Sequence, residues 1–324
     1  MLCRGWYGVI CANGGVNKLN ITNASVVGTL HDFPISSPPF LEYVDLRMNQ
    51  LYGTIPPTIG NSLILSILTC RLIGFRGTIP QQIGSLTKLD TLHIFDNHLN
   101  GSTPGELGNV KNLTVLKLHD NQLTVTIPTS FGNLRNLDTL FLRTNKLSSS
   151  IPKKLAYLDN LVALAMGVNQ FSGHLPEQLC QGGKLEIFMV MSNKLTGPIP
   201  RAFGIYQKLR FIDLSDNDFH GELRSNWGKC ESLTDLQIAR NNISGNIPPE
   251  IGNVKGLQGL DLSSNHLVWH TPREFGKLTS LLNLFVQNNH ISGNFPKELG
   301  SLTKLLPLNL SDNRLNGLIP RRLR

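Results

Sequence analysis

The chain has 324 residues, of which 40% are hydrophobic and only 16% are charged. A charged fraction below the roughly 25% of ordinary soluble domains, together with this many apolar residues, excludes a disordered chain. Lys and Arg exceed Asp and Glu by 30 to 22, for a net charge of +8, but no basic run is longer than a pair such as Arg321-Arg322. We therefore expect no nucleic-acid partner.

The beginning of the chain predicts neither a signal peptide nor a membrane anchor. Met1 to Trp6 has no charged start followed by an apolar core, which a secretion signal requires. Nowhere does the chain approach the roughly 18 consecutive apolar residues of a membrane helix. Its five cysteines are too few for a disulfide scaffold and lack the spacing of a zinc site. We expect no direct membrane insertion, no metal and no cofactor.

From Leu41 to the end, the chain repeats every 24 residues without insertion or deletion. Each repeat begins with leucine, carries inward apolar positions three and five residues later, and has asparagine eight residues later. Proline follows seven residues after the asparagine. Only Ile73 breaks the asparagine column, and only Arg224 breaks the proline column. The first residues of the repeats are Leu41, Leu65, Leu89, Leu113, Leu137, Leu161, Leu185, Leu209, Leu233, Leu257, Leu281 and Leu305.

Each repeat predicts a short strand followed by a turn and a return segment. The period-two alternation of its apolar residues indicates a strand with one buried face, and stacked repeats place these strands in a parallel sheet. The asparagine amide is expected to satisfy backbone groups of adjacent coils. Glycine and proline set the backbone angles of the following turn. One coil cannot bury its own apolar face, so its stability depends on its neighbours.

The repeat reads LxxLxLxxNxLxGxIPxxLGxLxx and is identified as a leucine-rich repeat, whose Gly-Ile-Pro half resembles the plant-specific class. The resemblance covers twelve repeats over residues 41–324, the last incomplete and without a C-terminal cap. It implies an α/β solenoid, a right-handed leucine-rich-repeat superhelix with a parallel sheet on its concave face and 24-residue plant-type repeats. Residues 1–40 are then the remnant of an N-terminal cap and its first strand.

The cysteines are expected to play different roles. The stretch from Cys3 to Cys11 resembles the N-terminal cap of plant leucine-rich-repeat ectodomains, in which two such cysteines form a disulfide; two free thiols are the alternative. That disulfide would imply an oxidising, extracellular setting. Cys70 occupies an inward column and is expected to be a small buried hydrophobe. Cys180 and Cys230 stand two repeats apart, roughly 10 Å, so Cys180 is expected to be unpaired.

Six sequons offer expected N-glycosylation sites, although several would occur by chance in an asparagine-rich chain. They begin at Asn20, Asn23, Asn100, Asn112, Asn242 and Asn309. The chain stops at Arg324, inside a repeat, and we expect it to be a fragment or truncated product of something longer.

Residues beside the inward apolar positions are expected to line the concave face. Early repeats place basic and aromatic residues there, middle repeats apolar ones and later repeats acidic ones. An uncharged apolar patch on an open surface favours a covering partner, whereas an assortment of exposed residues is the alternative. Twelve strands about 4.8 Å apart leave room for about sixteen extended residues. The expected ligand-binding residues are Arg71, His93, Phe95, Lys117, Phe141, Arg143, Ile187, Met189, Met191, Phe211, Asp213, Asp216 and Asp235.

Two segments, Asn226 to Cys230 and Ile243 to Gly252, resemble subfamily XII plant receptor-like kinases of the male-discoverer-interacting type. The resemblance implies the extracellular, peptide-binding region of a plasma-membrane receptor kinase in signalling or defence, with a leucine-rich-repeat co-receptor kinase as a second partner. The chain itself has no glycine-rich phosphate loop, His-Arg-Asp loop or Asp-Phe-Gly motif, so we expect no enzyme. The alternative is a secreted inhibitor of cell-wall polygalacturonases or another leucine-rich-repeat interaction protein.

Overall fold

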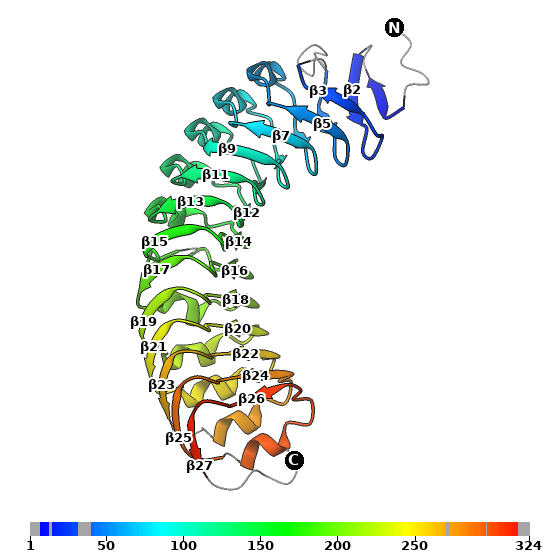
Figure 1. The fold of residues 1–324 in the computed structure, drawn as a ribbon. Helices are drawn as coiled ribbons and strands as arrows, with labels where there is room; N and C mark the ends of the chain where they lie inside the picture. The colour runs from blue at the N-terminus through cyan, green and yellow to red at the C-terminus, as the bar shows by residue number, and fades with distance from the viewer. Residues whose placement is uncertain are drawn as a thin grey trace. The chain divides into compact units, whose positions relative to one another are not determined.

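The computed structural model describes residues 7–12, 15–31, 40–179, 181–269, 273–295 and 297–316. It contains two compact units, Met1–Gln170 (unit 1) and Phe171–Arg324 (unit 2). Each unit is a stack of coils of one design (Figure 1). No helix within the described ranges is long and apolar enough to cross a membrane.

The apolar columns of the repeat form the first sheet, as predicted. Leu116, for example, is fully buried and lies between Leu92 and Leu140 in parallel, in-register strands. The strands of unit 1 are β1 (Val9–Ala12), β2 (Gly15–Asn20), β4 (Tyr43–Asp45), β6 (Ile67–Thr69), β8 (Thr91–His93), β10 (Val115–Lys117), β12 (Thr139–Phe141) and β14 (Ala163–Ala165). Those of unit 2 are β16 (Ile187–Met189), β18 (Phe211–Asp213), β20 (Asp235–Gln237), β22 (Gly259–Asp261), β24 (Asn283–Phe285) and β26 (Leu308–Asn309). Among the strands that the structure describes, only β1 pairs antiparallel, with β2.

A second parallel sheet follows the asparagine in each coil, where the repeat pattern predicted only a turn. Its strands pair through the residues before the Gly-Ile-Pro segment, as Gln122 of β11 pairs with Asn100 of β9. In unit 1 they are β3 (Val27–Thr29), β5 (Gln50–Gly53), β7 (Gly74–Gly77), β9 (His98–Ser102), β11 (Gln122–Val125) and β13 (Lys146–Ser149). β15 (Gln170–His174) starts at the boundary, and unit 2 continues with β17 (Lys194–Gly197), β19 (Asp218–Glu222), β21 (Asn242–Gly245), β23 (His266–Trp269), β25 (His290–Asn294) and β27 (Arg314–Asn316).

The return segments are five-residue 3₁₀ helices, and the described part of the chain holds no α-helix. Most start directly after the column proline, whose extended backbone leads into the turn. In unit 1 they are η1 (Pro57–Asn61), η2 (Gln81–Ser85), η3 (Gly105–Asn109), η4 (Thr129–Asn133) and η5 (Lys153–Tyr157). In unit 2 they are η6 (Arg201–Ile205), η7 (Ser225–Lys229), η8 (Pro249–Asn253), η9 (Arg273–Lys277) and η10 (Lys297–Ser301).

The asparagine column holds the coils together, as the repeat pattern predicted. Nδ2 of Asn97 donates to the carbonyl of Cys70 in the preceding coil at 2.7 Å, and Oδ1 of Asn97 accepts from the amide of Phe75 at 3.2 Å. Both groups of the side chain thus satisfy backbone atoms that the core would otherwise leave unpaired. The residue before each asparagine has a positive φ, from Met48 (58°) to Asp312 (52°).

The cysteine predictions have mixed outcomes. Cys70 is buried and free, as expected for an inward position, and burial raises the pKa of its thiol. Cys230 is also buried and free, with a pKa raised by burial to about 11. Cys11 is disulfide-bonded, whereas its expected partner Cys3 lies outside the described residues, as does Cys180. The pairing of Cys3 with Cys11 therefore stays a prediction.

Candidate functional site

The first sheet has one face against the core and one face pointing away from it, which we call the sheet face. In each coil three side chains reach it: one before, one between and one after the two inward apolar residues. In unit 1 the second of these positions runs from Asp45 through Thr69, His93 and Lys117 to Phe141 along paired strands. The sheet faces of units 1 and 2 differ in chemistry.

The basic side chains on the sheet face of unit 1 are largely paired with carboxylates. Nε of Arg71 lies 3.0 Å from Oδ2 of Asp96, and Nη2 of Arg143 lies 3.3 Å from Oδ2 of Asp120. Because these aspartates sit one residue before the column asparagine, they reach the guanidinium groups of neighbouring coils. The expected basic stripe is therefore mostly a row of ion pairs, in which each arginine side chain remains more than 40% exposed. Sequence reasoning missed both aspartates.

The start of this face carries an ion pair with one buried partner, which the sequence did not reveal. Asp45 is 1% exposed and receives bonds from Nε and Nη2 of Arg47, the shorter at 2.7 Å. The hydroxyl of Tyr43 also donates to Asp45 at 3.2 Å. Burial alone would raise the pKa of the Asp45 carboxyl, but the bonds from Arg47 outweigh it and hold that pKa below its ordinary value.

Four rings form an aromatic ladder along the middle of unit 1. Phe95 stacks on His119 with ring centroids 4.1 Å apart, while His93 and Phe141 meet this pair edge-on, each at 5.8 Å. His119 is only 6% exposed because the neighbouring rings cover it. Burial, followed by the charge of Lys117, lowers the pKa of His93 to about 4.

Burial, followed by the charge of Arg143, likewise lowers the pKa of His119 to about 4. Two cations extend the ladder: the Arg71 guanidinium lies 5.1 Å from the Phe95 ring centre and the Lys117 ammonium 5.2 Å from that of Phe141. This geometry is that of cation–π contact. Because their pKa values are about 4, His93 and His119 are both neutral near pH 7. The positive charge on this face comes from Lys117 and the outer edges of the arginines.

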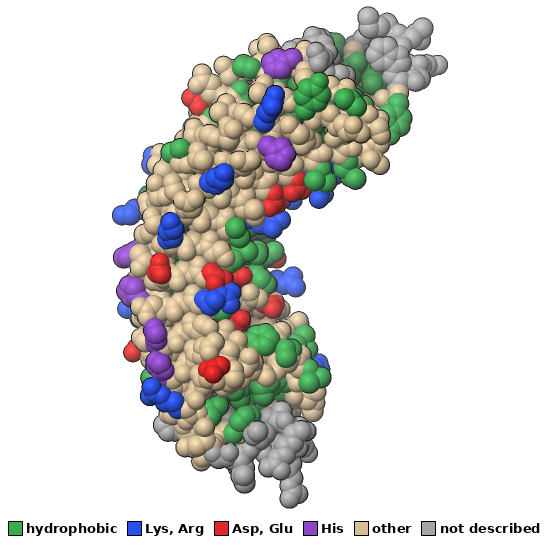
Figure 2. Space-filling view, viewed as in Figure 1, with side chains coloured by type: hydrophobic (Ala, Val, Ile, Leu, Met, Phe, Trp, Pro, Cys, Tyr) green, Lys and Arg blue, Asp and Glu red, His purple; other side chains and the backbone are tan. Residues whose placement is uncertain are grey.

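The sheet face of unit 2 begins with an apolar patch, which consists of Ile187, Met189, Met191 and Phe211. Ile187 is 37% exposed and the other three are half-buried. Ile187 pairs with Phe211 across adjacent strands, so the patch is continuous. Figure 2 shows hydrophobic side chains beside acidic and basic ones on the side where Figure 1 draws β16, β18 and β20. Apolar surface of this kind is commonly covered by a partner.

Three acidic residues adjoin the apolar patch but differ in availability. Asp213 is 8% exposed, its Oδ1 accepts from the amide of Ser215 at 3.0 Å, and burial raises its pKa. Asp216 is paired with Arg240, whose Nη2 donates to it at 2.7 Å. Asp235 is half-buried and forms no ion pair within the described residues. Of the three predicted acidic positions, Asp213 is buried, Asp216 is paired with Arg240, and Asp235 is the half-buried carboxylate that has no ion pair among the described residues.

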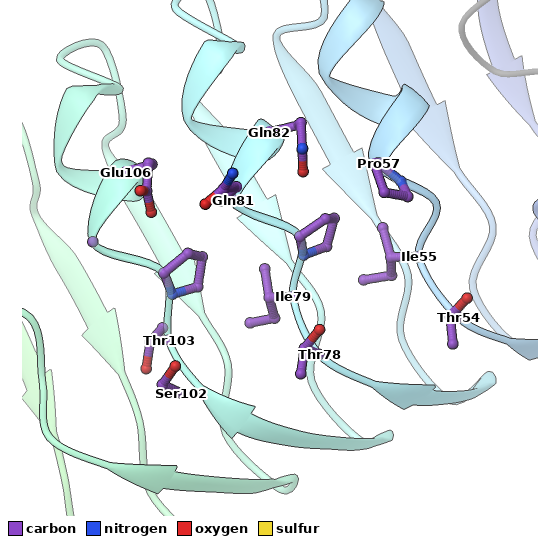
Figure 3. Close-up of a pocket in the computed structure, with 13 residues that line it drawn as sticks. Thr54, Ile55, Pro57, Thr78, Ile79, Gln81, Gln82, Ser102, Thr103 and Glu106 are labelled. Carbon is purple, nitrogen blue, oxygen red and sulfur yellow. The ribbon is translucent and has the colours of Figure 1, made fainter.

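Two grooves lie away from the sheet face, at the starts of the 3₁₀ helices. In unit 1, a groove of about 630 Å³ crosses three coils and is lined by uncharged residues except for Glu106 (Figure 3). Its threonine, isoleucine and proline positions recur in each coil, so the repeat itself produces it. The groove of unit 2, about 970 Å³, instead carries Glu177, Arg201, Glu222 and Arg224. No group of three or more metal-ligating side chains occurs among the residues described.

The predicted glycosylation sites divide by exposure. Asn23, Asn100, Asn112 and Asn242 are exposed, whereas Asn20 and Asn309 are half-buried in strands of the first sheet. Modification at any of the six stays a prediction.

Comparisons with known proteins agree with this architecture. Two models of the leucine-rich-repeat family match the chain, one at residues 111–171 and one at residues 40–62, 208–230, 232–254 and 256–278. The crystal structure of PEPR1 with AtPEP1 superposes with a TM-score of 0.94 at 36% identity over 98% of this chain. The chain is a leucine-rich-repeat solenoid of the plant receptor-kinase type.

Two further similarities are to plant receptors. MDIS1-interacting receptor like kinase 2 of Arabidopsis thaliana is 52% identical over 58 residues, which are 18% of this chain and 6% of that protein. The plant peptide hormone receptor RGFR1, solved in complex with RGF2, is 30% identical over 98% of this chain, with a TM-score of 0.85. This chain covers 45% of the PEPR1 chain and 58% of the RGFR1 chain, so it spans about half of each solved receptor.

Proposed function

We propose that this chain is the ligand-recognition part of a plant cell-surface receptor kinase of subfamily XII and that its ligand is an extended peptide. The observation that supports this most is the similarity, over 98% of the chain, to a receptor solved with a peptide hormone. The apolar patch on the open sheet face of unit 2 agrees with it. The proposal places the chain outside the plasma membrane, in signalling or defence, with a leucine-rich-repeat co-receptor kinase as a second partner.

In this proposal, apolar side chains of the peptide cover Ile187, Met189, Met191 and Phe211. Burying a partly exposed aromatic residue such as Phe211 against a ligand gives the kind of anchor that contributes about 2 kcal/mol or more to binding. On unit 1, acidic groups of a ligand would meet Lys117 and the exposed edges of Arg71 and Arg143, with His93, Phe95 and Phe141 beside them. Because the arginines are already paired with aspartates, their contribution is to orientation and association rate more than to affinity.

The test starts with a library of random 12-residue peptides, selected for binding to the full chain. Affinities of the selected peptides are then measured by calorimetry for the parent and for the variants Phe211→Ala and Met189→Asp. We expect each variant to bind at least about tenfold more weakly, which corresponds to about 1.4 kcal/mol. The matched controls Lys153→Ala and Lys255→Ala change exposed residues at a 3₁₀ helix and the turn after one, and should bind like the parent. Unchanged affinity of the Phe211 and Met189 variants would place the peptide elsewhere.

A further inference from the structure

Two exposed histidines lie side by side on the second sheet of unit 2, away from the sheet face. His266 is the first residue of β23 and His290 is the first residue of β25, and these two strands pair with each other. The centroids of the two imidazole rings are 5.7 Å apart, and the ring planes differ by 29°. Figure 2 shows histidine side chains on the side where Figure 1 draws the second-sheet strands of unit 2.

The two imidazoles contact each other but have no hydrogen-bond or ion-pair partner in the part of the chain that the structure describes. A neutral imidazole carries one ring nitrogen with a free lone pair, so the pair presents two such nitrogens to solvent. The arrangement is not a general product of the repeat. His98 has the same position in its own repeat, but the neighbouring repeats carry Gly74 and Gln122 there.

We propose that His266 and His290 together bind one transition-metal ion that prefers imidazole ligands, such as Zn²⁺, Ni²⁺ or Cu²⁺. Imidazole nitrogens bind Zn²⁺ at about 2.0–2.1 Å, so the centres of two rings on one tetrahedral ion lie roughly 5 Å apart. The observed separation of 5.7 Å is close to this requirement. Rotation about χ2, which is broad for histidine, can turn one nitrogen of each exposed ring toward the ion.

The chemistry of the pair sets which ions it selects. Imidazole suits zinc, copper and nickel, whereas Ca²⁺ and Mg²⁺ require oxygen ligands. Because both histidines are exposed, water can complete the coordination shell. The spacing of the cysteines argues against a zinc site built from cysteines, and that argument does not apply to a pair of histidines.

A shared ion would also join two adjacent coils of unit 2. Each coil of a solenoid depends on its neighbours for stability, and an ion that binds the folded chain stabilises it. The site lies on the second sheet and not on the sheet face, so the inference is independent of the proposed peptide ligand.

Calorimetric titration of the full chain with ZnCl2 at pH 7.5, after treatment with a chelator, tests the site. We expect His266→Asn and His290→Asn each to bind Zn²⁺ at least about tenfold more weakly than the parent, since even the loss of groups that only orient a metal ligand costs about 10–100-fold. The matched control is His98→Asn, which removes an exposed histidine at the same repeat position in unit 1 and should bind like the parent. Excess CaCl2 or MgCl2 should not compete.

Two further measurements report on the geometry of the site. Electron spin resonance of Cu²⁺ bound to the parent should show splitting from two nitrogen ligands, and each of the two histidine variants should show splitting from one. Added ZnCl2 should raise the urea midpoint of the parent and leave that of either variant unchanged. Lowering the pH to 5 should weaken binding of Zn²⁺ to the parent, because protonation takes up the lone pair that binds the metal.

The outcomes separate this site from the proposed function. Unchanged affinity for Zn²⁺ in either variant, or an equal loss in His98→Asn, would overturn the metal site. Peptides selected from the random library should bind both variants like the parent, so failure of the metal site leaves the proposed function standing. A library that yields no binding peptide would in turn leave the metal site standing.

Discussion

Asn217 binds the carbonyl of Val190, which lies 27 residues earlier in the chain, through its Nδ2 at 3.0 Å. The same Nδ2 lies 3.2 Å from the carbonyl of Leu214, and Oδ1 accepts from the amide of Leu195 at 3.0 Å. Asn217 is only 8% exposed, so water cannot replace these bonds. One side chain therefore joins three backbone segments of adjacent coils in unit 2.

Replacing Asn217 with alanine should destabilise unit 2. The substitution leaves a buried amide and buried carbonyls without partners, and each such group costs about 1–3 kcal/mol. We expect urea unfolding to show a loss of about 2–4 kcal/mol in the free energy of unfolding. The control Asn253→Ala removes an exposed asparagine at the end of η8 and should have little effect. An equal response of both variants would contradict the role of the column asparagine.

Val168 has a φ of 54° and is 44% exposed. A β-branched residue is strained in this left-handed region, whereas asparagine tolerates it. Val168→Asn should therefore stabilise unit 1 by about 1 kcal/mol, measured as a higher urea midpoint. Val162→Asn is the control, because Val162 does not have a positive φ, and it should bring no gain. A loss of stability in Val168→Asn would show that packing of the valine outweighs its backbone strain.

Acid should destabilise unit 1 through its ladder histidines. The pKa of His93 and that of His119 are about 4 in the folded chain, against an ordinary value of 6.5. A lowered histidine pKa means that the folded state resists protonation, so stability is constant above about pH 6.5 and falls as the pH drops toward 4. The melting temperature of the parent should therefore be lower at pH 5 than at pH 7.5.

The variant His119→Phe tests this origin of the pH dependence. It keeps a ring for stacking on Phe95 and removes one titrating group, so its melting temperature should fall less than that of the parent between pH 7.5 and pH 5. His98→Phe changes an exposed histidine of the second sheet and should leave the fall unchanged. If His119→Phe and the parent lose the same number of degrees, the buried imidazole is not the cause.

The ion pair of Asp45 and Arg47 predicts an asymmetry between its two partners. The Asp45 side chain is 1% exposed and the Arg47 side chain is 42% exposed. Arg47→Ala leaves a buried carboxylate without its cation, although Tyr43 and the backbone amide at position 47 still donate to it, and should cost about 1–3 kcal/mol. Asp45→Asn should cost less, because Arg47 can turn toward solvent and the amide oxygen still accepts from Tyr43. Chemical denaturation of both variants measures the loss of unfolding free energy in each. A larger loss in Asp45→Asn than in Arg47→Ala would contradict this assignment.

The repeat pattern alone determined the stacked coils, the buried leucine columns and the bonds of the asparagine column. Those features depend on periodicity, because a residue type that recurs every 24 positions must occupy the same place in every coil. The same pattern placed Ile187, Met189, Met191 and Phe211 together on the sheet face. It did not predict the second sheet, because a glycine interrupts the alternation of apolar residues after the asparagine in most repeats, and glycine there indicates a turn.

Only the tertiary structure decided which side chains of the sheet face are available. Arg71 and Asp96 are 25 residues apart in the chain, and their contact follows from the offset between adjacent coils. Neighbouring rings bury His119, although Arg71 and Arg143, at the same position of other repeats in unit 1, have side chains more than 40% exposed. Charge pairing and burial on this face depend on the side chains of adjacent coils, whereas the repeat pattern specifies each coil separately.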